Sequence, residues 1–125
     1  MIDPNFILLY VAHPATSARF YGDLLAKAPL ESSPTFALFA LDSGVMLGLW
    51  ARQTVEPSVA GNVIGMGGEL AFAVADNATV DLWHDKWCGR GIPIAQAPTA
   101  MDFGYTFVGC DPDGHRLRVF APASR

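Results

Sequence analysis

Two turns with a shared pattern constrain this chain more than any other feature. The first is the segment 42–44, Asp-Ser-Gly, and the second is the segment 111–114, Asp-Pro-Asp-Gly. Apolar runs flank each turn, so each turn predicts a β-hairpin. A strand-like run and a helix-like run precede each hairpin in the same order. The pattern therefore predicts a tandem repeat of one supersecondary unit.

Each half predicts the order strand, helix, strand, strand, strand. In the first half we expect strands at 6–11, 36–41 and 45–51, a helix at 15–25 and a short edge strand between Pro29 and Pro34. In the second we expect strands at 69–75, 92–94 and 105–110, a final strand after the turn at 111–114, and a helix at 78–88. The predicted fold is α+β, with tandem βαβββ units forming a cupped mixed sheet and helices on the outer face. One domain, 1–125, would contain units at about 5–52 and 69–122 and a glycine-rich linker at about 53–68.

Charge and composition exclude several classes of function. The net charge of −4 leaves no basic stripe for nucleic acid. No apolar run approaches the length of a membrane span, and no signal peptide is visible, so we expect a cytoplasmic protein. The two cysteines lack metal-ligand spacing and are expected to be reduced. A mean hydropathy of +0.28 is high for a soluble monomer, so some apolar surface should be covered by a partner or should line a cavity. We expect both a homodimer and a cavity lined by apolar side chains. Domain swapping through the linker stays open.

The chain resembles the vicinal oxygen chelate superfamily, which groups glyoxalases, bleomycin-resistance proteins, extradiol dioxygenases and fosfomycin-resistance enzymes. The resemblance rests on Phe-Tyr-Gly-Asp-Leu-Leu at 20–25, Glu-Leu-Ala-Phe-Ala-Val at 69–74 and the turn at 111–114. It implies paired βαβββ units, usually in dimers, whose sites are cups formed by an eight-stranded surface.

Metal-dependent members of that superfamily place ligands on the first and last strands of each unit. Carried over by position, these ligands correspond to Phe6, Gly48, Glu69 and Arg118. Phenylalanine and glycine side chains supply no donor atom, and an arginine would repel a divalent cation. Only Glu69 could coordinate, and the three histidines belong to no motif. We therefore expect no metal and no cofactor, and these four positions argue against an enzyme.

If those positions face the groove, strand alternation predicts the rest of its lining. The expected lining is Phe6, Leu8, Tyr10, Met46, Gly48, Trp50, Glu69, Ala71, Ala73, Arg116, Arg118 and Phe120. A flat aromatic ligand could stack on such a surface. The alternative is that these aromatic residues form the core of a dimer interface. We further predict an ion pair between Glu69 and Arg118, and the alternative is that both orient a polar group of a ligand.

Within the superfamily, the segments 39–50, 101–107 and 111–119 are similar to phenazine-antibiotic resistance proteins. This similarity implies that Trp50 is a stacking platform, with help from Tyr105 and Phe107. The predicted function is metal-independent binding and sequestration of a small planar aromatic compound, an antibiotic such as a phenazine or a bleomycin-type drug. One alternative is a metal-dependent glyoxalase-type lyase or dioxygenase with a non-standard ligand set. Another is a binder of an endogenous metabolite.

Overall fold

The computed structural model describes residues 5–56 and 68–123, and each range forms one compact unit. The first unit contains β1 (Phe6–Val11), α1 (Pro14–Leu25), β2 (Glu31–Ser32), β3 (Phe36–Ala40), β4 (Met46–Ala51) and the 3-10 turn η1 (Arg52–Thr54). The second contains β5 (Glu69–Ala73), α2 (Asn77–Gly89), β6 (Ile94–Met101), β7 (Gly104–Cys110) and β8 (Arg116–Pro122). The predicted α+β fold of tandem βαβββ units is confirmed. Most of the predicted linker at 53–68 lies outside the described residues.

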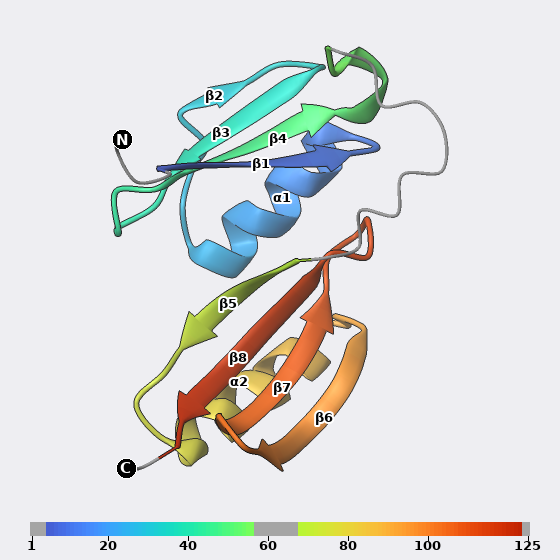
Figure 1. The fold of residues 1–125 in the computed structure, drawn as a ribbon. Helices are drawn as coiled ribbons and strands as arrows, with labels where there is room; N and C mark the ends of the chain where they lie inside the picture. The colour runs from blue at the N-terminus through green and yellow to red at the C-terminus, as the bar shows by residue number, and fades with distance from the viewer. Residues whose placement is uncertain (1–4, 57–67, 124–125) are drawn as a thin grey trace. The chain divides into compact units, whose positions relative to one another are not determined.

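Both units have the same sheet topology. The strand orders are β1-β4-β3-β2 and β5-β8-β7-β6. In each sheet the first and last strands of the unit are parallel neighbours, and the remaining pairs are antiparallel. One helix covers one face of each sheet (Figure 1). The opposite face of each sheet, called here the open face, carries the alternate side chains of every strand. Within the described residues, no helix has the length and apolar character needed to cross a membrane.

The core of the first unit lies between α1 and its sheet. Helix α1 begins at Pro14, which suits a first helical turn because the missing N–H needs no partner there. Its residues Ala18 and Tyr21 are buried against the sheet. The strands contribute Phe39, Leu47 and Leu49, which are also buried.

The core of the second unit lies between α2 and its sheet. Asp76 caps α2 by accepting a hydrogen bond of 2.8 Å from the backbone N–H of Thr79, and the Thr79 contacts lower the pKa of Asp76. Trp87 projects from α2 and packs edge-on against Phe72 and Phe107, with ring centroids 6.2 and 5.0 Å apart. The Trp87 indole nitrogen is buried without a hydrogen-bond partner among the described residues.

Strand β6 differs most from the expectation. The predicted edge strand was 92–94, but the observed strand runs from Ile94 to Met101. Its pairing with β7 shifts register between Gln96 and Thr99, and Pro98 lies within this irregular segment. Strand β6 lies at the edge of the sheet and pairs only with β7. The missing N–H of Pro98 therefore breaks no hydrogen bond to a strand on the other side. The short edge strand predicted between Pro29 and Pro34 is confirmed as β2.

Candidate functional site

The open face of the first unit is apolar. In the β1–β4 pairing, Phe6, Leu8 and Tyr10 lie opposite Met46, Gly48 and Trp50. The three β1 side chains remain 40–46% exposed. These predicted lining residues therefore share one face of the sheet, as strand alternation requires.

A shallow hollow of about 390 Å³ lies on this face, lined by Phe6, Leu8, Phe36 and Trp50. Tyr10 meets the Trp50 ring edge-on, with centroids 6.4 Å apart. Tyr10 and Trp50 also lie directly opposite each other in the β1–β4 pairing. An apolar aromatic lining of this kind favours a flat, weakly polar ligand surface.

Gly48 lies beneath the side chains of this hollow. A Cβ atom at position 48 would approach Leu8 Cδ2 to 2.7 Å and Phe36 Cζ to 2.9 Å. Leu8 and Phe36 therefore occupy the space above the glycine. Gly48 permits this close packing and is itself buried, so the expectation that Gly48 lines the groove is corrected.

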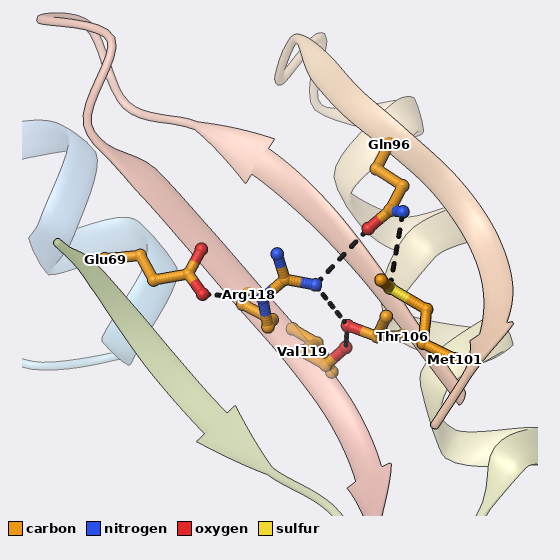
Figure 2. Close-up of polar contacts among 6 residues, drawn as sticks. All are labelled: Glu69, Gln96, Met101, Thr106, Arg118 and Val119. Atoms are coloured by element: carbon orange, nitrogen blue, oxygen red, sulfur yellow. Dashed lines mark hydrogen bonds and ion pairs between the residues drawn. The ribbon is translucent and has the colours of Figure 1, made fainter. Parts of the chain in front are cut away.

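The open face of the second unit is organised around Arg118. Its Nε donates a hydrogen bond of 2.7 Å to Glu69 Oε1, so the ion pair expected from the sequence is present. Its Nη1 donates to Gln96 Oε1 at 3.3 Å and to Thr106 Oγ1 at 3.2 Å. Figure 2 shows these contacts converging on one guanidinium from β5, β6 and β7. The Arg118 side chain is 16% exposed and that of Glu69 is 32% exposed.

One aromatic ring lies against this arginine, and a second ring packs against the first. The Phe103 ring centroid lies 5.5 Å from Arg118 Cζ, within the range of a cation–π contact. Phe103 also meets Phe120 edge-on at 6.0 Å. Sequence reasoning missed Phe103, and it likewise missed Gln96 and Thr106. Only Thr106 could have been found from the sequence. Thr106 pairs with Phe120, a predicted open-face residue, so alternation along β7 places Thr106 on the same face.

Tyr105 and Phe107 lie on the other face of the same sheet. The Tyr105 hydroxyl donates a hydrogen bond of 2.7 Å to Asp81 of α2, and this bond raises the pKa of Tyr105. Phe107 is fully buried between Trp87 and His84 of α2. Because side chains alternate along β7, neither residue can share the open face with Arg118. Their expected role beside a stacked ligand is therefore corrected.

The residues at the family's ligand positions do not fit a divalent metal. Phe6 offers only carbon atoms, and Gly48 is covered by neighbouring side chains. The Glu69 carboxylate already accepts a hydrogen bond from the Arg118 guanidinium, whose positive charge would repel a cation. One carboxylate beside an arginine is not a donor set for zinc, nickel, iron or manganese.

A second group of metal-type side chains lies at the β7–β8 turn. Ligand atoms of Asp111, Asp113 and His115 lie within 4.8 Å of one another. Asp111 Oδ1 accepts hydrogen bonds from the backbone N–H groups of Asp113 and His115, and Oδ2 lies 2.7 Å from His115 Nδ1. The hydrogen bond to Asp111 raises the pKa of His115, although partial burial acts against it. Both oxygens of Asp111 are thus engaged in holding the turn.

Comparisons with known proteins agree with this architecture. A model of the Glyoxalase/Bleomycin resistance protein/Dioxygenase superfamily matches residues 4–119. The phenazine antibiotic resistance protein EhpR of Enterobacter agglomerans is 29% identical over 121 residues, covering 94% of this chain and 91% of EhpR. The solution structure of protein ATC0852 from Agrobacterium tumefaciens is 52% identical, with a TM-score of 0.88, covering 99% of this chain and 100% of that one. A glyoxalase/bleomycin resistance protein/dioxygenase from Nocardioides shares the fold at 22% identity and a TM-score of 0.83, covering 99% of this chain and 85% of that one.

Proposed function

Because the chain belongs to the Glyoxalase/Bleomycin resistance protein/Dioxygenase superfamily, we propose that it binds and sequesters a small planar aromatic compound without a metal ion. The hollow lined by Phe6, Leu8, Phe36 and Trp50 carries the proposal. Its lining is entirely apolar and includes three aromatic rings, one of them an indole. A flat ring placed there would bury apolar area and stack on Trp50.

The relative EhpR, a phenazine antibiotic resistance protein, suggests the class of compound. A phenazine is a flat, fused, mostly apolar ring system, which matches the character of the hollow. We therefore propose a phenazine-type antibiotic as the ligand and drug sequestration as the biological role. A metal-dependent lyase or dioxygenase is disfavoured because Phe6, Gly48 and Arg118 supply no ligand atoms.

We also propose that the protein works as a cytoplasmic homodimer. Phe6, Leu8 and Tyr10 remain 40–46% exposed in the single chain, and a second copy could cover part of that surface. Cys88 and Cys110 are both free thiols, which suits a reducing compartment. Sedimentation equilibrium would test the assembly, and a purely monomeric protein would contradict it.

Tryptophan fluorescence titration with phenazine tests the binding function. Trp50, Trp83 and Trp87 are the three tryptophans, so we expect quenching in the wild type and in a Trp83→Phe control. Calorimetry should show that Trp50→Ala weakens binding by about three- to tenfold, in line with the loss of an aromatic stack, whereas Trp50→Phe keeps most of the affinity. If phenazine produces neither quenching nor a thermal shift, the proposed function is wrong. An unchanged affinity in Trp50→Ala would remove Trp50 from the site.

A further inference from the structure

We propose that Leu8 determines which ring systems the apolar hollow of the first unit accepts. The Leu8 side chain fills a notch above Gly48 and thereby selects a flat, fully aromatic compound over one with a puckered, saturated ring. This inference rests on the proposed function and adds the residue that sets the selectivity of the site. All of the residues concerned lie in the first unit.

The open face of the first sheet has a glycine at its centre. In the pairings of β4 with its two neighbours, Gly48 lies opposite Leu8 of β1 and opposite Leu38 of β3. Alternation along β4 places Met46 and Trp50 before and after Gly48 on the same face. These four neighbours all carry large apolar side chains. The missing side chain of Gly48 therefore leaves a notch among them.

Leu8 and Phe36 fill this notch from the two strands beside β4. A Cβ atom at position 48 would approach Leu8 Cδ2 to 2.7 Å and Phe36 Cζ to 2.9 Å, so both side chains reach the space directly above the glycine. Leu8 nevertheless remains 44% exposed, and both residues line the hollow. The hollow therefore ends at these two side chains and not at the backbone of β4.

The depth that Leu8 gives to the hollow decides which ligand shapes make good contact. A fused aromatic ring system is flat and can contact several lining side chains at once. A saturated ring is puckered, and its projecting CH₂ group would hold the rest of the ligand away from the lining. A gap of about 0.5–1 Å already forfeits about a quarter to a half of each dispersion contact. Without the Leu8 side chain, the projecting CH₂ group could enter the notch.

A simpler role for Leu8 predicts a different result. If Leu8 is only one apolar residue among several in the lining, its removal should weaken the binding of flat and puckered ligands by the same factor. If Leu8 determines the accepted shape, its removal should weaken the flat ligand relative to the puckered one. The ratio of the two affinities is the quantity to measure, because the intrinsic difference in stacking between the ligands is common to all variants.

The experiment compares phenazine with tetrahydrophenazine, in which one outer ring is saturated and the number of ring atoms is unchanged. Calorimetry should show that the wild type prefers phenazine. In Leu8→Ala this preference should fall by about fourfold, the factor expected when one CH₂ group becomes buried in the notch. Adding Gly48→Ala to Leu8→Ala refills the notch with a methyl group and should restore the preference.

Leu38→Ala is the matched control. It removes the same atoms from a residue that also lies opposite Gly48 but does not line the hollow, so it should keep the preference for phenazine. Leu8→Val removes less of the side chain and should give a smaller loss of preference than Leu8→Ala. This second variant provides the test if Leu8→Ala is unstable, and circular dichroism at the titration temperature shows which variants are folded.

The outcomes separate this inference from the proposed function. If the wild type shows no preference, or if the preference is unchanged in Leu8→Ala and Leu8→Val, the role of Leu8 is overturned and phenazine binding stands. A loss of preference in Leu38→Ala as large as that in Leu8→Ala would also overturn it, because any lost leucine on this face would then have the same effect. If neither ligand binds the wild type, the proposed function is wrong and this inference falls with it.

Discussion

Arg118 Nε donates a hydrogen bond of 2.7 Å to Glu69 Oε1. The bond joins β8, the last strand of the second unit, to β5, the first strand of the same unit. The pair is diagonal, because Arg118 lies opposite Ala71 and Glu69 lies opposite Arg116. It occupies two positions at which metal-dependent relatives are expected to place ligands. At these two positions the structure has an ion pair between one carboxylate and one guanidinium.

A double-mutant cycle measures the energy of this pair. We expect Glu69→Gln and Arg118→Met to show a coupling free energy of about 1 kcal/mol, between the values for exposed and buried pairs. Arg118→Met should cost more than Glu69→Gln because it also removes the contacts with Gln96 and Thr106. Urea unfolding of the four proteins provides the free energies. Strictly additive effects would mean that the contact contributes nothing to stability.

A single methyl group at position 48 should destabilise the first unit. Gly48→Ala places a Cβ 2.7 Å from Leu8 Cδ2 and 2.9 Å from Phe36 Cζ. We expect a loss of about 1–3 kcal/mol in the free energy of unfolding, as for overpacked sites, and partial recovery when Leu8→Ala is added. Gly89→Ala at the end of α2 is the matched control, because its Cβ would meet no atom within 4 Å. A neutral Gly48→Ala would show that Leu8 and Phe36 move aside readily.

The His115–Asp111 pair should make stability depend on pH. The pKa of His115 is raised above its ordinary value of 6.5, chiefly by the hydrogen bond to Asp111. Since the folded state holds the proton more tightly, the stabilisation is complete below the ordinary pKa and is lost as the pH rises through the raised value. The stability difference between wild type and His115→Gln should therefore be larger at about pH 5.5 than at about pH 9. Urea midpoints at the two pH values measure it. A difference that does not change with pH would contradict the assignment.

Removal of divalent metals should leave the protein unchanged. The donor atoms at positions 6, 48, 69 and 118 do not form a coordination set. We expect the same Tm after EDTA treatment, and no increase in Tm when zinc, nickel or manganese is added. Mass spectrometry for metals on the purified protein provides the independent check. Stoichiometric metal would point to the Asp111, Asp113 and His115 group, the one cluster of that kind among the described residues.

The predicted open faces of β1, β4, β5 and β8 combined strand alternation with the ligand positions that the resemblance implied. In β5 and β8 the odd and even positions differ clearly in polarity, whereas β1 is apolar throughout, so there the resemblance supplied the face. For β7 the sequence left the face of Tyr105 and Phe107 open, because Gly-Tyr-Thr-Phe-Val-Gly-Cys carries large side chains at both odd and even positions. Their role beside a ligand came only from the resemblance, and the structure shows the register through the pairing of β7 with β8. Gly104 has a φ of +149°, and a Cβ would lie 2.0 Å from the backbone oxygen of Ala121. The pairing of Thr106 with Phe120 places Thr106 on the open face, and Tyr105 and Phe107 contact α2.

The sequence alone determined the tandem βαβββ order, the apolar face of the first sheet and the ion pair of Glu69 with Arg118. These features follow from local patterns and from the pairing of the first and last strands of a unit. Only the tertiary structure decided that Gly48 is covered, that Tyr105 and Phe107 face α2, and that Gln96, Thr106 and Phe103 surround Arg118. Those outcomes depend on the bulge in β6, the pairing of β7 with β8 and the packing of Leu8 over β4. Such contacts between distant segments leave no periodic signal in the chain.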